Sequence, residues 1–211
     1  MNKTRLEFLS DGIFAIVFTL LVIEIHVPVL EDKLSASALI NELLHLGPLF
    51  GAYVLSFAVL ATFWISHHGF YQLFVQTINR QLMLLNLLYL MFIALIPFSA
   101  HLIGSYPSNP AALIFYGVHI MVIASIALLS VTYALRSREI ENPQIQQRIM
   151  KQARVRIMLP IIFSALGIAV SFVYVPLTYI LFAFPIIFNA IPGSLNFAEK
   201  ALGFSFGEDT D

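Results

Sequence analysis

The sequence predicts an all-α integral membrane protein with six transmembrane helices, and three observations support this class. Of the 211 residues, 59% are hydrophobic and only 11% are charged. The mean hydropathy of +0.87 lies far above that of soluble domains. Six stretches each approach the roughly 20 apolar residues that a helix needs to cross a bilayer. We therefore expect residues 1–211 to form a single membrane domain.

The six predicted spans are joined by connections of very different length. The spans cover about residues 7–27, 47–67, 83–104, 110–135, 156–175 and 177–195. Pro28, Glu31, Asp32 and Lys33 mark a loop after the first span, and a short interfacial helix is predicted over 37–45. The fourth and fifth spans are joined by residues 136–156, which carry six basic side chains, and a tight turn near Pro176 separates the last two spans.

Lysine and arginine gather on one side of this predicted topology. Six spans place both termini on the same side, and ten of the eleven basic residues fall there. The ten are Lys3, Arg5, Arg80, Arg136, Arg138, Arg148, Lys151, Arg154, Arg156 and Lys200. Only Lys33 falls on the opposite side. Because basic residues are retained in the cytoplasm, both termini are predicted to be cytoplasmic.

Several classes of function are excluded by what the sequence lacks. The chain contains no cysteine, which rules out disulfides, cysteine-ligated zinc and iron–sulfur clusters. No nucleic-acid motif is present, and the basic segment 136–156 is explained as a topology determinant or a surface for acidic lipid headgroups. No HExxH motif or Ser/His pairing points to a protease. We expect no enzymatic activity, no cofactor and no bound metal.

The first predicted span combines an apolar run with acids at both ends. No charge interrupts Gly12 to Ile23, which Asp11 precedes and Glu24 follows. A charged side chain in hydrocarbon costs at least about 2.5–3.5 kcal/mol, so both acids are expected to face protein or water. With about 100° per residue, Ile16 and Ile23 share one stripe of the helix with Leu20, and Thr19 lies at its edge. By periodicity alone this stripe fits helix packing or a pore lining.

Polar residues of three predicted spans fall at one depth in this topology. Ser10 and Asp11 lie near the cytoplasmic end of the first span, His67 and His68 end the second, and Asn86 begins the third. These side chains can satisfy one another's hydrogen bonds as a latch between helices. A proton-handling or gating role is the alternative, because a histidine beside a carboxylate titrates near neutral pH.

Two further histidines raise the possibility of a haem or quinone protein. His101 and His119 are predicted on different helices, and membrane haem proteins use such histidines as axial ligands. However, His101 lies near the outer end of its span, whereas His119 lies about ten residues into the next. The two rings are therefore expected at different depths, which disfavours a shared haem.

The first span also carries a recognisable motif. Residues 5–24 resemble the signature of the transmembrane protein 175 family, potassium channels of lysosomes and prokaryotes, whose motif is R-x-x-x-F-S-D. Arg5 opens the motif, and Leu9 stands where the family has Phe, directly before Ser-Asp. The tracts FWISHHGF at 63–70 and LNLLYLMFIALIPFSAHLIG at 85–104 also resemble the family's second and third helices.

This resemblance implies a prokaryotic homotetramer in which the first helix of each six-helix subunit lines a central pore. The narrow part of the family's pore aligns with Ile16, Leu20 and Ile23, with Thr19 nearby. No TVGYG filter is present, and a ring of aliphatic side chains offers no oxygen to an ion. Such a constriction is expected to act as a size and dewetting barrier with modest preference for potassium over sodium.

The resemblance also assigns roles to the polar residues. It implies a structural latch made of Arg5, Ser10, Asp11, His67, His68 and Asn86. The expected function is a potassium-permeable leak channel in a prokaryotic plasma membrane, with lipids and other copies of the chain as partners and no nucleic acid. The alternative is a proton-coupled secondary transporter that uses Asp11, Glu24, His67 and His68 as proton carriers.

Overall fold

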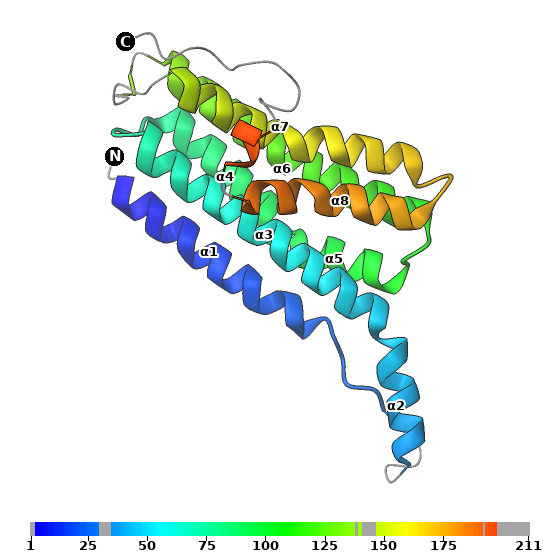
Figure 1. Cartoon of the computed structure of the whole chain (residues 1–211). Coiled ribbons are helices and arrows are strands. Elements are labelled where there is room, and N and C mark those ends of the chain that lie inside the picture. The colour runs from blue at the N-terminus through cyan, green and yellow to red at the C-terminus, as the bar shows by residue number, and fades with distance from the viewer. Residues whose placement is uncertain (1–2, 30–34, 138, 141–146, 192, 198–211) are drawn as a thin grey trace.

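The structure is a computed structural model and describes residues 3–29, 35–137, 139–140, 147–191 and 193–197, with side chains from residue 149 onward in the fourth range. Every regular element in these ranges is an α-helix (Figure 1). The helices are α1 (Lys3–Ile23), α2 (Ala36–His45), α3 (Gly47–Phe74), α4 (Arg80–Ala94), α5 (Ile96–Ser105), α6 (Pro110–Arg136), α7 (Gln147–Val170) and α8 (Val175–Ala190).

The helices form an elongated bundle whose axes run roughly in one direction (Figure 1). Five segments are long and apolar enough to cross a membrane, namely α1, α3, α4 together with α5, α6, and the part of α7 from Ile149. Helix α8 is apolar but has only 16 residues, which gives it a length of about 24 Å, short of the roughly 30 Å hydrocarbon core. Helix α2 projects from one end of the bundle.

The core lies where α3, α4, α5 and α6 meet, and α1 contributes one face to it. Leu60, Ile93 and Tyr116 are among the side chains that are completely buried there. Buried residues of α1 recur at the three- and four-residue spacing of a one-sided helix. They are Leu6, Ser10, Phe14, Val17 and Leu21.

Helices α6, α7 and α8 pack closely because two glycines face the ring of Phe182. A Cβ on Gly167 would lie 2.6 Å from Phe182 Cε1, and a Cβ on Gly117 would lie 2.7 Å from Ile168 Cγ1. Both distances are shorter than ordinary carbon contacts. The missing side chains therefore allow the last two helices to approach α6.

Two predicted spans were too short at the end of the bundle where α1 begins. Helix α3 continues to Phe74, so His67 and His68 lie about two turns inside the helix rather than at its end. Helix α7 begins at Gln147, so Arg156, expected in the hydrophilic connection, lies within a helix. The added turns of α3 are held by buried aromatic residues, and Ile157 of α7 packs against the same cluster.

Three other helix boundaries differ from the predicted ones, each for a local reason. Helix α1 ends at Ile23 rather than at residue 27, directly before the charged Glu24. The third predicted span is divided at Leu95, because Pro97 has no N–H to donate to the carbonyl of Ile93. Helix α8 ends five residues before the predicted boundary of 195, since Ile191 precedes a proline and adopts an extended backbone.

The short helix predicted over 37–45 corresponds to α2. Ser35 caps its N-terminus by accepting a hydrogen bond from the backbone N–H of Ala38 at 3.3 Å. The predicted loop residues Glu31, Asp32 and Lys33 lie outside the described residues.

One end of the bundle carries the start of α1, the start of α4, the end of α6 and the start of α7 (Figure 1). The basic residues of these helix ends therefore gather there. They are Lys3, Arg5, Arg80, Arg136, Lys151 and Arg154. Arg138, Lys200 and the side chain of Arg148 lie outside the described residues, as does Lys33.

Candidate functional site

The stripe predicted on the first helix lies on the face of α1 that points away from the bundle. Ile16, Leu20 and Ile23 are 58%, 40% and 61% exposed in the single chain, whereas Val17 is 1% exposed. Thr19 is exposed on the same side, and its hydroxyl donates to the carbonyl of Ile16 at 2.7 Å. Its oxygen lone pairs stay free to accept a further hydrogen bond.

From Phe8 onward, the exposed residues of α1 are mostly apolar. The exposed large hydrophobic residues from α1 into the following loop are Phe8, Leu9, Ile16, Leu20, Val22, Ile23, Val27 and Val29. A contiguous apolar surface of this kind marks a protein or membrane interaction surface. In a bilayer it can contact lipid, neighbouring copies of the chain, or the lumen of a pore formed by several copies.

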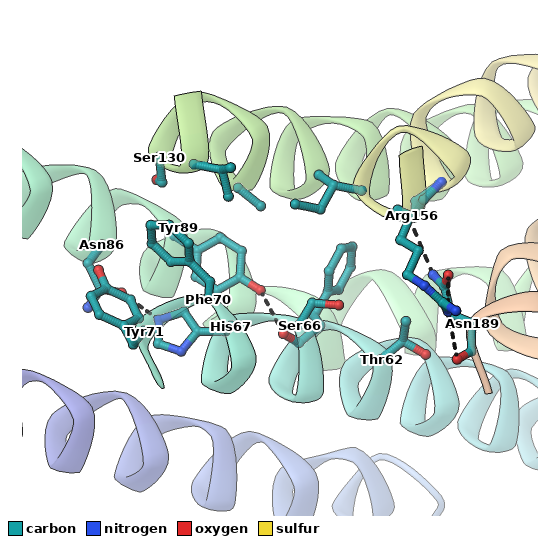
Figure 2. A pocket seen from close by; sticks show the side chains of 15 residues that line it. Thr62, Ser66, His67, Phe70, Tyr71, Asn86, Tyr89, Ser130, Arg156 and Asn189 are labelled. Atoms are coloured by element: carbon teal, nitrogen blue, oxygen red, sulfur yellow. Dashed lines mark hydrogen bonds between the residues drawn. The ribbon is translucent and has the colours of Figure 1, made fainter. Parts of the chain in front are cut away.

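Behind this face, a chain of hydrogen bonds joins α1, α3 and α4. Asn86 Nδ2 donates to Ser10 Oγ at 3.1 Å, and Ser10 Oγ donates to the carbonyl of Leu6 at 2.9 Å. Because the amide nitrogen of Asn86 faces Ser10, its Oδ1 faces His67 Nε2 at 2.7 Å and accepts the proton of that nitrogen. Figure 2 shows the pairing of His67 with Asn86. Ser10 and Asn86 are buried, so each bond replaces hydration that the group has lost.

His67 is also enclosed by aromatic rings. Its ring centroid lies 4.8 Å from that of Tyr71, 5.3 Å from that of Tyr89 and 5.8 Å from that of Phe14. The ring of Tyr89 is nearly parallel to it, at an interplanar angle of 13°. These contacts fix the orientation of the imidazole toward Asn86.

Asp11 lies beside this chain but has a different partner. Its Oδ1 accepts a hydrogen bond from Trp64 Nε1 at 3.0 Å, and the indole of Trp64 stacks on His68 at 5.5 Å between ring centroids. Trp64 therefore belongs to the polar contacts between α1 and α3, although it was outside the predicted latch. The sequence signal for the stacking of Trp64 on His68 was their four-residue spacing, which places both side chains on the same side of a helix. Arg5 is exposed and has no ion pair among the described residues.

Of the four residues of the alternative transporter, Asp11, His67 and His68 lie near one another and Glu24 is remote. His67 bonds to Asn86 and Asp11 bonds to Trp64, so no hydrogen bond links the histidine to the carboxylate. Glu24 follows the far end of α1, thirteen residues or about 20 Å along the helix from Asp11. It faces His101, with 3.6 Å between Glu24 Oε2 and His101 Nδ1.

The two histidines considered as haem ligands have other contacts. His119 Nε2 donates to the carbonyl of Phe92 and its Nδ1 lies 2.9 Å from Ser99 Oγ, so both ring nitrogens are occupied. Phe92 lies in the last turn of α4, and its carbonyl also accepts the backbone N–H of Leu95 at 3.1 Å. His119 therefore stabilises the break between α4 and α5. Over the ranges that the structure describes, no group of three or more His, Asp or Glu side chains is arranged to hold a metal.

Comparisons with known proteins match both the sequence and the fold. The sequence model of the endosomal/lysosomal potassium channel TMEM175 matches residues 5–97. A protein from Streptomyces collinus named potassium channel is 32% identical over 185 residues, which are 84% of this chain and 87% of that protein. The crystal structure of a lysosomal potassium-selective channel TMEM175 homolog from Chamaesiphon minutus superposes with a TM-score of 0.76 at 27% identity, covering 89% of this chain and 96% of the other.

A vertebrate protein is also similar over the whole chain. The zebrafish endosomal/lysosomal proton channel TMEM175 is 27% identical over 220 residues. The match covers 100% of this chain but 41% of the zebrafish protein. Similar proteins thus carry two different names, potassium channel and proton channel.

Proposed function

Because the chain belongs to the TMEM175 family, we propose that it forms a potassium-permeable leak channel without enzymatic activity. The observation that carries this proposal is the division of α1 into a buried face and an exposed apolar face. Val17 packs into the bundle while Ile16 and Leu20, on the other side of the same helix, stay exposed. The stripe that the family resemblance assigns to the pore is therefore not used for packing within the subunit and is available to face other copies of the chain.

In the proposed channel, four copies of the chain place α1 around a central pore. Ile16, Leu20 and Ile23 then each contribute a ring of four side chains, and Thr19 adds hydroxyl oxygens near the Ile16 ring. Aliphatic rings offer no oxygen to replace the hydration shell of an ion, so they restrict passage by size and by dewetting. Potassium holds its water less tightly than sodium and passes more easily. Selectivity for potassium is accordingly modest.

The polar contacts behind α1 hold this helix in place in the proposed channel. Ser10 is bonded through Asn86 to His67, and Asp11 is bonded to Trp64 next to His68. These side chains point away from the Ile16 stripe and do not contact permeating ions. They fix the rotation of α1 and thereby decide which residues face the pore. Arg5, one turn before Leu9, completes the signature at the entrance.

The proposed orientation puts both termini in the cytoplasm of a prokaryotic cell, with the channel in its plasma membrane. The basic residues at the described helix ends support this orientation, because they gather at the end of the bundle where α1 begins. That end carries Lys3, Arg80 and Arg136 on three different helices.

Proton permeation is the second candidate, because the zebrafish relative is named a proton channel. An aliphatic constriction that wets transiently would let protons pass along a short file of water. Coupled transport by Asp11, Glu24, His67 and His68 is the third, and two observations weigh against it: no hydrogen bond links Asp11 to His67, and Glu24 lies near the other end of α1.

Current measurements on the purified protein in a planar bilayer separate these functions. With potassium chloride facing sodium chloride, a leak channel gives a continuous current whose reversal potential lies toward the potassium equilibrium potential. A proton channel gives a reversal potential that follows an imposed pH gradient. A transporter gives no unitary conductance and carries potassium only when protons move with it, and this outcome would refute the channel proposal.

A further inference from the structure

A cavity lies inside the subunit, behind α3 and away from the exposed face of α1. It is bordered by α3, α4, α6, α7 and α8, and its volume is about 40 Å³. Figure 2 shows Arg156 and Asn189 at one end and His67, Tyr71 and Asn86 toward the other. The walls between them are mainly apolar and aromatic.

Arg156 brings a positive charge to this cavity without an acidic partner. Its Nη1 donates to the carbonyl of Asn189 at 3.2 Å and lies 3.4 Å from Asn189 Oδ1, and its Nη2 donates to Ser194 Oγ at 3.3 Å. All three acceptors are neutral. In the described part of the chain no carboxylate forms a salt bridge with Arg156.

The contact with Asn189 only partly explains why a charged residue stands at position 156. A basic side chain at a helix C-terminus stabilises the last carbonyls, and α8 ends at Ala190. A neutral amide donor would also serve the carbonyl, however, so this contact does not account for the positive charge. The cavity therefore offers an anion a guanidinium that no carboxylate of the described residues neutralises.

The cavity continues into an open groove on the outer surface between α3 and α7. Ser66, Arg156 and Ile157 line both spaces, so the guanidinium borders the groove as well as the cavity. Ile65 and Leu73 line the groove and are exposed, which indicates that it opens away from the bundle. Among the residues that the structure describes, no acidic side chain lines either space.

Arg156 lies at the level where a bilayer presents its headgroups. Lys151 and Arg154 are exposed on the first turns of α7, and Arg156 is only two residues, or about 3 Å, further along the axis. Long basic side chains near helix ends extend toward the lipid headgroups. Basic pockets between transmembrane helices are known to bind the headgroups of acidic lipids.

We propose that the groove between α3 and α7 binds an acidic phospholipid whose phosphate pairs with Arg156. One acyl chain lies along the apolar groove past Ile65, and the phosphate lies in the groove beside the guanidinium. The bilayer supplies this molecule at the required level, and the lining matches both its charge and its apolar chains. The site lies apart from the exposed face of α1 and does not depend on what the channel conducts.

Native mass spectrometry of the assembled protein tests this site. The protein is equilibrated in mixed micelles of phosphatidylglycerol and phosphatidylcholine, and the lipid retained per subunit is counted. The wild type is expected to retain phosphatidylglycerol preferentially. Arg156→Gln keeps a donor for the carbonyl of Asn189 but removes the charge, and it is expected to lower that retention about fivefold.

A second test variant and two matched controls distinguish binding at this site from effects of surface charge or added bulk. Arg154→Gln removes the same charge from an exposed position and is expected to leave retention within about twofold of the wild type. Gly69→Leu fills the groove, where a Cβ would meet nothing within 4 Å, and is expected to reduce retention while Arg156 stays in place. Gly51→Leu places the same bulk on the far part of α3 and is expected to have no effect.

Three outcomes would overturn the proposal. The first is retention at the wild-type level in both Arg156→Gln and Gly69→Leu. The second is an equal loss in Arg154→Gln, which would indicate surface attraction alone. The third concerns the melting temperature. We expect phosphatidylglycerol to raise the melting temperature of the wild type and not that of Arg156→Gln. If the lipid raises both melting temperatures equally, so that the variant melts lower by the same amount with and without it, Arg156 serves only to cap α8.

Discussion

Neighbouring residues of α1 differ sharply in their surroundings, and this difference underlies the proposed channel. Ile16 is largely exposed in the single chain and Val17 is almost fully buried, although one peptide bond separates them. The about 100° rotation per residue makes this possible, because it turns adjacent side chains to different faces. A substitution at one position therefore affects the outer face of the helix, whereas a substitution at the next affects the core.

At the residue scale, the contact of Asp11 with Trp64 is expected to support assembly and not ion selection. Trp64→Phe removes the indole donor 3.0 Å from the carboxylate and leaves Asp11 without that bond. The stability of the folded protein is expected to fall by about 1.5–3 kcal/mol, the range for a hydrogen bond to a charged group. Asp11→Asn weakens the same contact by removing the charge.

The measurements are the yield and melting temperature of the assembled protein, followed by its permeability ratio in a bilayer. Both variants should assemble less well, and the channels that do form should keep the wild-type ratio of potassium to sodium permeability. Well-assembled channels with a changed ratio would mean that Asp11 contacts the permeating ions.

At the element scale, the chain of bonds through Asn86 is expected to hold three helices in register. Asn86→Leu removes both bonds of the amide, which leaves Ser10 Oγ and His67 Nε2 in a buried place without those partners. Each lost partner costs about 1–3 kcal/mol. The melting temperature of the purified protein should fall clearly, whereas Leu87→Ala, at an exposed neighbour on α4, should change it little. Equal effects of the two substitutions would refute the latch.

Hydropathy identified the elements, but it located their ends less well. It measures where the chain leaves hydrocarbon, and helices such as α3 and α7 continue beyond that level. For the same reason His67 and Arg156 were expected at the ends of spans and lie inside helices. The break at Leu95 was marked in advance only by Pro97, a residue that membrane helices also tolerate without a break.

The polar contacts could be foreseen in part. Depth alone placed Ser10, His67 and Asn86 at one level, and the structure joins them in one chain of hydrogen bonds. Depth could not decide which side of α3 faces α1, because that rotation depends on packing between helices. Asp11 was therefore expected beside His67 and is bonded to Trp64 instead.

At the scale of the whole molecule, the distribution of charge predicts the orientation in the membrane. The described ends of α1, α4, α6 and α7 carry basic residues at one end of the bundle. A reporter that is active only in the cytoplasm should therefore be active when fused to the C-terminus. The same reporter inserted after Val29, in the connection between α1 and α2, should be inactive. The opposite pattern would reverse the topology and the side from which α1 enters the membrane.

A pore is a property of the assembly and not of one chain. A single sequence shows an apolar stripe, and a single subunit shows that the stripe is exposed, but the walls of a lumen come from several copies. Ile16 is the central residue of the proposal, which assigns the narrowest ring to four copies of its side chain. In the proposed channel, Leu20 and Ile23 extend the same barrier one and two turns further along α1.

The most direct test is the single-channel conductance and the potassium-to-sodium permeability ratio of Ile16→Ala, with Val17→Ala as the matched control. Removing branched bulk from Ile16 widens the ring on all four sides and lets ions keep more of their water, so conductance should rise and the permeability ratio should fall toward one. Ile16→Asn should ease wetting without improving the preference for potassium. Val17→Ala, which truncates a buried side chain, should lower stability by about 1 kcal/mol and leave permeation unchanged. Unchanged conductance and an unchanged permeability ratio in well-assembled Ile16→Ala channels would contradict the assignment of Ile16 to the constriction.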